Sequence, residues 1–236
     1  MVKLYRNLTC FLILTAFYSC KSIHAISEVP ADAYLVNFKD YSLLDSTVTN
    51  AASGHKIKMD IEQMDSLLKL TPYTTGRKPL TVKLSQISSL KIYRNTFDID
   101  VLTVPFKIRP SVKGFPEQLN ANFDAALYLG RRRDNYEISN VKTKGESKLH
   151  LTGVGYGYGG FIGLGSVTMN PFVTNQTIDY EYDGFVLNGG FAGIYDAKKF
   201  NIGLALGADF LVDKNRRNWI YQCKPWLGVL FGINLN

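Results

Sequence analysis

The chain has few of the residues that build disulfide frameworks, metal centres and hydrolytic sites. Its 236 residues include only 3 Cys and 3 His. Beyond the first 19 residues only Cys20 and Cys223 remain, too few for the several bridges that stabilise many small exported domains. Beyond residue 25 the imidazoles are His55 and His150, so a catalytic triad or a metal site of three or four ligands has little to draw on. We therefore expect no enzymatic activity, no metal and no cofactor.

The chain also lacks the context that a nucleotide-binding loop requires. Residues 155–160 satisfy the pattern G-x-G-x-x-G, which binds dinucleotides when it joins a strand to a helix and an acidic residue follows about 20 residues later. Here glycine recurs at every second position from 153 to 159, and Val154, Tyr156 and Tyr158 stand between. This period predicts a strand with one glycine face and one aromatic face, and no nucleotide partner.

The N-terminal apolar run is too short to cross a membrane as a helix. It covers residues 8–18 and follows two basic residues, whereas a spanning helix needs roughly 20 apolar residues. A basic start and a short apolar run predict a secretory signal within residues 1–25. Cleavage before Cys20, where the sequence resembles a relaxed lipobox, would leave a lipid-modified cysteine and is the favoured interpretation. Cleavage after Ala25 is the alternative.

The excess of positive charge is moderate. The formal net charge is +7, and removing residues 1–19 takes away Lys3 and Arg6 and leaves +5. Nucleic acid is not an expected partner of an exported chain, whereas anionic lipid headgroups and lipopolysaccharide phosphates are. Two basic clusters follow the ends of alternating strands and are candidate headgroup contacts, with solvated loop charge as the alternative. The clusters are Arg131, Arg132 and Arg133, and Lys214, Arg216 and Arg217.

Residues 26–95 have mixed polarity and are predicted to form a separate N-terminal segment, either periplasmic or placed as a plug. Apolar residues recur at helical spacing from Asp60 to Leu70, which predicts a short helix there. Those from Leu80 to Tyr93 fit a strand with a break near Ser88.

From residue 96 onward, long stretches alternate between apolar residues and polar or small ones. The clearest are residues 118–130, 201–213 and 227–236. Because side chains of a strand point alternately to its two faces, each stretch has one apolar face. Phe97–Pro110 is a fourth candidate, with a phase change near Val101 and Leu102 that predicts a bulge. Such strands exceed the usual five or six residues and match the roughly 9–11 residues of a strand tilted across a bilayer.

Four carboxylates lie on the polar parity or at the ends of these strands: Asp98, Asp100, Asp124 and Asp209. Inside a barrel such groups pair with interior Arg or Lys, and lining a pore is the alternative.

Aromatic residues gather near the strand ends. Rings at both ends of apolar strands are typical of a membrane interface, with ordinary core packing as the alternative. The candidates are Tyr128, Tyr136, Tyr180, Tyr182, Tyr195, Phe200, Trp219, Tyr221 and Trp226.

Three stretches in the C-terminal two-thirds carry a resemblance to a known family. They read DVLTVPFKIRP (100–110), LNANFDAALYLG (119–130) and DKNRRNWIYQCKPWLGVLFGINLN (213–236). Residues 97–236 thereby resemble the small, porin-like outer-membrane β-barrel proteins of the Bacteroidota type, which are largely uncharacterised. The resemblance implies an all-β fold, a place in the cell outer membrane and insertion by the barrel assembly machinery.

We therefore expect residues 96–236 to form a closed antiparallel transmembrane β-barrel of eight strands. Eight strands enclose an interior just wide enough for side chains, so the predicted role is structural or that of a narrow pore. The alternative is a soluble, lipid-anchored barrel facing the periplasm, which would turn its apolar parity inward around a small apolar ligand. A third interpretation is a barrel enzyme acting on lipids, with a Ser or Asp beside His150.

Overall fold

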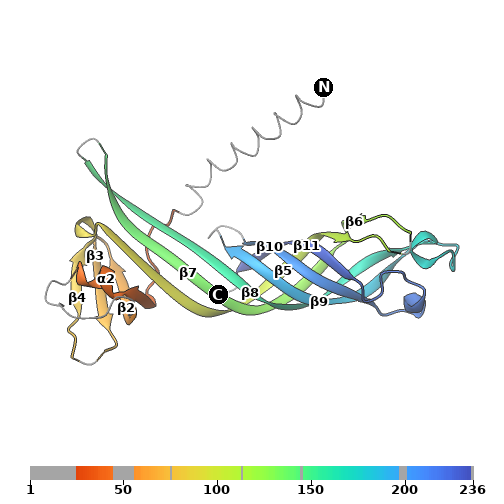
Figure 1. The fold of residues 1–236 in the computed structure, drawn as a ribbon, viewed down its shortest axis with the longest axis horizontal. Helices are drawn as coiled ribbons and strands as arrows, with labels where there is room; N and C mark the ends of the chain where they lie inside the picture. Colours follow the sequence, from red (N-terminus) through yellow and green to blue (C-terminus); the bar gives the residue numbers. More distant parts are fainter. Residues whose placement is uncertain are drawn as a thin grey trace, which may run out of the picture. The chain divides into compact units, whose positions relative to one another are not determined.

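The computed structural model is an all-β molecule built on one antiparallel sheet of 11 strands (Figure 1). It describes residues 25–44, 56–74, 76–112, 114–143, 146–196 and 201–234. The strands are β1 (Asp32–Asn37), β2 (Lys56–Met64), β3 (Leu67–Pro72), β4 (Leu80–Lys83), β5 (Ser89–Arg109), β6 (Gln118–Asn120), β7 (Asp124–Thr143), β8 (Glu146–Met169), β9 (Tyr182–Asp196), β10 (Asn201–Leu211) and β11 (Pro225–Asn234).

Helical segments are short throughout the described part of the chain. They are α2 (Phe38–Ser42), η2 (Leu84–Gln86), η3 (Phe172–Thr174) and η4 (Lys214–Arg217). None of the helices in these residues has the length and apolar character needed to cross a membrane. Residues 1–24 of the predicted signal segment, including the lipidation candidate Cys20, lie outside the described residues.

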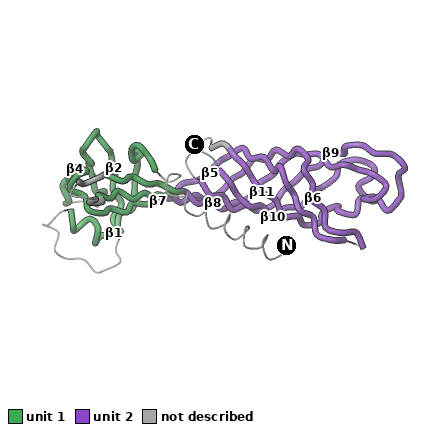
Figure 2. Tube along the Cα trace, turned by 90° about the horizontal axis from the view of Figure 1, so that it is seen from above, with its two compact units in different colours: residues 1–94, 134–154 green, residues 95–133, 155–236 purple. Residues whose placement is uncertain are grey.

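The chain divides into two units (Figure 2). Residues 1–94 and 134–154 belong to the first, and residues 95–133 and 155–236 to the second. Strands β5, β7 and β8 contribute residues to both. The hairpin that joins β7 to β8 is therefore grouped with the N-terminal residues.

In the first unit the predicted helix over Asp60–Leu70 is wrong. These residues lie in a hairpin of β2 and β3, in which Met64 pairs with Leu67. The period-two alternation begins upstream, at Ile57, and Asp65 in the turn has a left-handed φ of 51° that ends any helix. The buried residues of β2, one at every second position, are Ile57, Met59 and Ile61.

Around this hairpin the first unit has a core of its own, to which β1 to β5, β7 and β8 all contribute. Ion pairs of one arginine connect three of its strands, β1, β5 and β7. Arg94 donates from Nη1 to Asp32 Oδ2 at 2.5 Å and from Nη2 to Asp134 Oδ2 at 2.7 Å. Burial alone would raise the pKa of Asp32, but the hydrogen bonds from Arg94 and from the Ala33 N–H outweigh it and lower that pKa.

In the second unit six strands close into a ring, in the order β5, β7, β8, β9, β10, β11, with β11 pairing back onto β5. The predicted count of eight is therefore wrong. The strands β7 and β8 are 20 and 24 residues long and absorb chain that the prediction divided among more strands. Residues 118–130 do not form one strand, because the three-residue β6 pairs with β5 outside the ring and β7 begins only at Asp124.

The bulge predicted near Val101 and Leu102 lies three residues further along β5. Thr103 pairs with Phe231 and Phe106 pairs with Val229, so Val104 and Pro105 together oppose one residue of β11. Pro105 has no N–H to donate to the ladder, which explains why the irregularity falls there. The buried residues of β5 have even numbers from Asp98 to Val104 and odd numbers from Lys107 onward.

Small residues on the inner face of the ring make room for large ones. An added Cβ at Gly207 would lie 2.5 Å from Trp226 Cζ2 and 2.9 Å from Phe161 Cζ, and Trp226 is fully buried. Gly193 on β9 lies instead on the exposed parity, and an added Cβ there would meet nothing within 4 Å. Gly203, Gly207, Gly228 and Gly232 all take the polar parity, as the alternation predicts.

These two glycines give a matched pair of substitutions. We expect Gly207→Ala to lower the free energy of unfolding by about 1–3 kcal/mol, because the new methyl overpacks a rigid aromatic contact. Gly193→Ala should leave it unchanged or slightly raised. Chemical denaturation of both variants measures the difference, and equal stabilities would show that the inner face is not tightly packed.

Candidate functional site: the wall and interior of the six-strand ring

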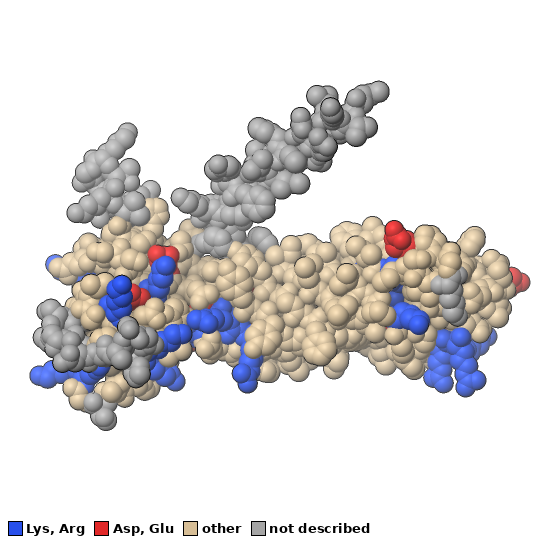
Figure 3. Space-filling model, in the orientation of Figure 1, with Lys and Arg blue, Asp and Glu red and all other residues tan. Residues whose placement is uncertain are grey.

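Large apolar side chains cover the outer face of the ring. Phe191 is 75% exposed, Leu204 is 70% exposed and Ile162 is 69% exposed. On the face drawn in Figure 3, a surface without charged side chains covers the middle of the second unit, and Lys and Arg gather beyond it. We call the following exposed apolar side chains of the second unit the apolar belt. It consists of Phe97, Ile99, Val101, Phe106, Ile108, Phe123, Leu127, Leu129, Tyr156, Tyr158, Ile162, Leu164, Phe185, Leu187, Phe191, Leu204, Leu206, Phe210, Leu227 and Phe231.

The inner face carries charge instead. Lys107 Nζ lies 2.7 Å from Asp124 Oδ1 and 3.0 Å from Asp209 Oδ1. Arg109 forms an ion pair with the second oxygen of Asp209. All four side chains are at most 2% exposed. Two cations thus face two carboxylates in a space that is closed to solvent, and we call these four residues the interior ion cluster.

Neighbouring polar and aromatic groups add further contacts to this cluster, although Arg109 Nη1 and Asp124 Oδ2 have no hydrogen-bond partner among the described residues. Trp226 donates from Nε1 to Asp209 Oδ1 at 2.9 Å, and the ammonium of Lys107 lies 4.6 Å from the centre of the Trp226 ring. Asn188 donates to Asp124 at 2.9 Å. Buried charges are tolerated only where such hydrogen bonds replace water.

A second group of buried charges lies nearer the other end of the strands. Arg132 forms an ion pair with Asp196, and its Nη1 lies 4.0 Å from Asp98 Oδ1. Asn201 donates to Asp100 at 3.0 Å. Thus all four carboxylates that the alternation placed on the polar parity are buried inside the ring. Three of them pair with Lys or Arg, and Asp100 accepts from an amide.

Glycines on β8 leave the space that these groups occupy. An added Cβ at Gly163 would lie 2.5 Å from Asn188 Oδ1, and one at Gly165 would overlap the Asp124 carboxylate. The strand predicted from the alternate glycines is therefore confirmed, and residues 155–160 lie within it. Its glycine face is turned inward, while Tyr156 and Tyr158 are 51% and 68% exposed.

The six predicted headgroup contacts divide between two environments. Arg131 and Arg133 are exposed on the outer face, whereas Arg132 is 8% exposed and paired inside the ring. Alternation along β7 explains the split, and Arg132 is thereby assigned to the interior. In η4, at the opposite end of the ring, Lys214, Arg216 and Arg217 are exposed.

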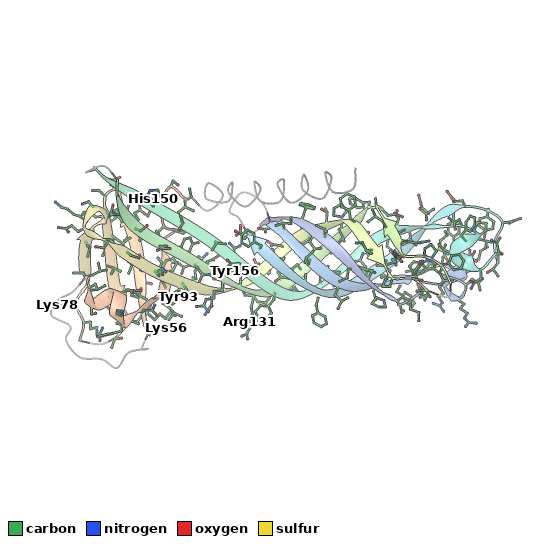
Figure 4. The ribbon with its side chains drawn as sticks, turned by 45° about the horizontal axis from the view of Figure 1, so that its top comes forward. Lys56, Lys78, Tyr93, Arg131, His150 and Tyr156 are labelled. Carbon is green, nitrogen blue, oxygen red and sulfur yellow. The ribbon has the colours of Figure 1, made fainter. Side chains whose placement is uncertain are left out.

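A groove opens on the outer face beside Arg131. It has a volume of about 560 Å³, and β5, β7 and β8 supply its walls. Figure 4 labels Arg131 on β7 and Tyr156 on the adjacent β8. The lining side chains that matter below are Phe97, Arg131, Arg133, Tyr156 and Tyr158.

Five of the nine aromatic residues predicted at a membrane interface are core residues instead, and Phe200 lies outside the described residues. Tyr128 and Trp226 are fully buried inside the ring, and Tyr136 belongs to the core of the first unit. Trp219 and Tyr221 are also buried. A sequence shows that aromatic residues lie near strand ends. Whether each one is buried or exposed depends on which face of the strand its position takes. Among the described residues, the aromatic residues exposed near the ends of the ring strands include Phe97, Phe123, Tyr156, Tyr158, Phe172, Tyr180, Phe185 and Phe210.

The remaining candidates for chemistry stand apart from one another. His150 is exposed on β8 within the first unit (Figure 4), and the exposed Cys223 is far from it along the chain. Among the described residues, no three His, Cys, Asp or Glu side chains are grouped so that they could hold a metal ion.

The charge balance of the interior ion cluster can be tested. Lys107→Met or Asp209→Asn should each lower the free energy of unfolding by about 3–5 kcal/mol, because either leaves an uncompensated buried charge. The double variant restores zero net charge among the four sites, so its loss should be smaller than the sum by about 1 kcal/mol or more. Lys69→Met is the control, since the pair that Lys69 forms with Glu62 is half exposed and 4.0 Å long. Strict additivity in chemical denaturation would contradict a coupled cluster.

Comparison with known proteins returned no match to this chain among protein-family models, curated proteins or solved structures. The resemblance to small outer-membrane proteins therefore stays a prediction from the sequence. What the chain can do is inferred below from the positions and chemistry of its own side chains.

Proposed function

We propose that the six-strand ring is a β-barrel embedded in the outer membrane, where it anchors the first unit and has no catalytic activity. One observation carries this proposal: the apolar belt faces outward while the charged side chains are buried inside. Water would select the opposite arrangement, because exposed apolar area and buried charge are both unfavourable there. Hydrocarbon around the ring reverses both preferences.

The length of the ring strands fits a bilayer. Strand β10 has 11 residues, which span about 34 Å at roughly 3.4 Å per residue. A tilt of about 40° reduces this to about 26 Å along the barrel axis, and the apolar band of outer-membrane barrels is about 25 Å tall.

Closure of the ring meets the main requirement of a strand in lipid. Where β11 pairs with β5, from Leu227 with Ile108 to Asn234 with Asp100, the ring has no free edge. An open edge would leave N–H and C=O groups unpaired in hydrocarbon, at several kcal/mol each. Six is also an even number of strands, as in most bacterial single-chain barrels.

The connections give the ring an orientation. At the end where β5 enters the ring, β9 ends at Asp196 before β10 begins at Asn201. Strands β7 and β8 continue past this end into the first unit, where β7 ends at Thr143 and β8 begins at Glu146. At the opposite end residues 110–123, 170–181 and 212–224 form long connections. Outer-membrane barrels have short periplasmic turns and longer external loops. The end of the ring that holds residues 95, 133 and 155 is then periplasmic, and η4 belongs to the cell surface.

The filled interior favours a structural role over a narrow pore. Trp226, Tyr128, Lys107 and Arg109 are among the largest fully buried side chains of the molecule. Barrels of about eight strands are already filled by side chains, and six strands enclose less space. The soluble alternative, a barrel with its apolar parity around a ligand, is disfavoured because that parity faces outward.

A charge in the middle of the apolar belt tests the membrane location. Leu206→Arg should prevent outer-membrane assembly, because Arg on a lipid face near mid-membrane costs about 2–4 kcal/mol. Met64→Arg is the matched control, since Met64 in the first unit and Leu206 are both 52% exposed. The measurements are retention in the outer membrane after an alkaline carbonate wash and heat-dependent mobility on a detergent gel. Normal assembly of the Leu206 variant would contradict the proposal.

Electrical recording separates the structural role from the pore. The purified chain in a planar lipid bilayer should carry no stepwise ion current, because the interior ion cluster and Trp226 occupy the lumen. Regular conductance steps from the wild-type chain would replace the structural role with that of a pore.

A further inference from the structure

We propose that the groove lined by Phe97, Arg131, Arg133, Tyr156 and Tyr158 is a binding site for the phosphate headgroup of a glycerophospholipid in the periplasmic leaflet. This inference rests on the proposed membrane location. It adds a defined site, a ligand class and a leaflet.

The positions of the arginines supply the affinity for phosphate. Arg131 and Arg133 occupy the outward parity of β7, and Arg132 between them is held inward by Asp196. Arg131 is exposed on the outer face of β7, and it lines the groove together with Arg133. A guanidinium presents parallel N–H donors that match two phosphate oxygens, and such charge-assisted bonds are among the stronger ones in proteins.

Aromatic side chains supply the rest of the surface. Phe97 is 62% exposed and Tyr158 is 68% exposed, next to the two arginines. The Tyr156 ring packs against Tyr195 of β9 with ring centres 5.5 Å apart, which fixes its position. Tyrosine is favoured at a membrane interface because its ring sits among acyl carbons while its hydroxyl stays among headgroups. A headgroup phosphate and the first carbons of its chains would both find matching groups here.

The pairing register locates the groove along the barrel axis. Tyr156 pairs with Tyr195, and Tyr195 pairs with Ile202 near the start of β10. This is the end at which β5 enters the ring and the connection from β9 to β10 is short, which is periplasmic in the proposed orientation. Lipids of that leaflet are glycerophospholipids, whereas lipopolysaccharide occupies the opposite leaflet beside η4.

The experiment uses the full chain, purified and delipidated in a neutral detergent. Native mass spectrometry would then measure retention of dimyristoylphosphatidylglycerol, with dimyristoylglycerol as the lipid that lacks phosphate. The test variant is Arg131→Gln with Arg133→Gln. The control, Lys69→Gln with Lys91→Gln, removes the same charge from exposed positions of the first unit.

We expect wild type to retain the phosphatidylglycerol and not the diacylglycerol. The Arg131 and Arg133 variant should retain at least about tenfold less, the effect of losing charge-assisted hydrogen bonds of about 1.5–3 kcal/mol. The control should retain as much as wild type. Substituting both arginines with Lys should restore part of the retention, since Lys keeps the charge but not the paired donors.

Three outcomes would overturn the site: no retention by wild type, equal retention by the Arg131 and Arg133 variant, or equal loss in the control. Carbonate washing of the same variants distinguishes this failure from failure of the proposed function. A chain that resists the wash but shows any of these outcomes lacks only the headgroup site. A wild-type chain that the wash releases lacks the membrane location as well.

Discussion

Pairing of β11 with β5 is the constraint on which the rest of the second unit depends. It joins the last strand of the chain to the strand that enters the ring first, so backbone groups across the ring find partners on both sides. The same closure sets the interior to a width that six strands allow. A narrow interior cannot hold bulk water around charged groups, so each charge there must be matched by protein atoms.

The narrow interior explains why glycines and large side chains are combined on the inner face. Trp226 fits because Gly207 and Gly228 lie against it, and Asp124 fits because Gly165 lacks a side chain. The glycines lower the β propensity of their strands, yet they allow a fully buried tryptophan to donate to Asp209. The interior is therefore stable only as a set, in which the small residues and the ion pairs require one another.

The sequence was most informative where structure depends on neighbours along the chain. Alternation over residues 201–213 predicts which face is apolar, and under the membrane interpretation it predicts that Asp209 pairs with an interior cation or lines a pore. The structure buries Asp209 beside Lys107. Features that depend on distant partners were not predictable in this way. Strand number depends on how far β7 and β8 extend, and the position of the bulge depends on the register against β11. Residues 60–70 fit a helical period although they form the hairpin of β2 and β3, because the turn at Asp65 interrupts the alternation of the two strands.

The three consecutive arginines take two different roles, because successive side chains of a strand point to opposite faces. They are chemically identical and adjacent, but the pleat sends Arg132 to the buried carboxylate of Asp196 and its neighbours to the outer face. Composition alone describes a basic cluster, and only the faces of β7 show that one member neutralises an interior acid. A surface role can therefore belong to Arg131 and Arg133 alone, because Arg132 could reach a lipid only by leaving a buried carboxylate without its partner.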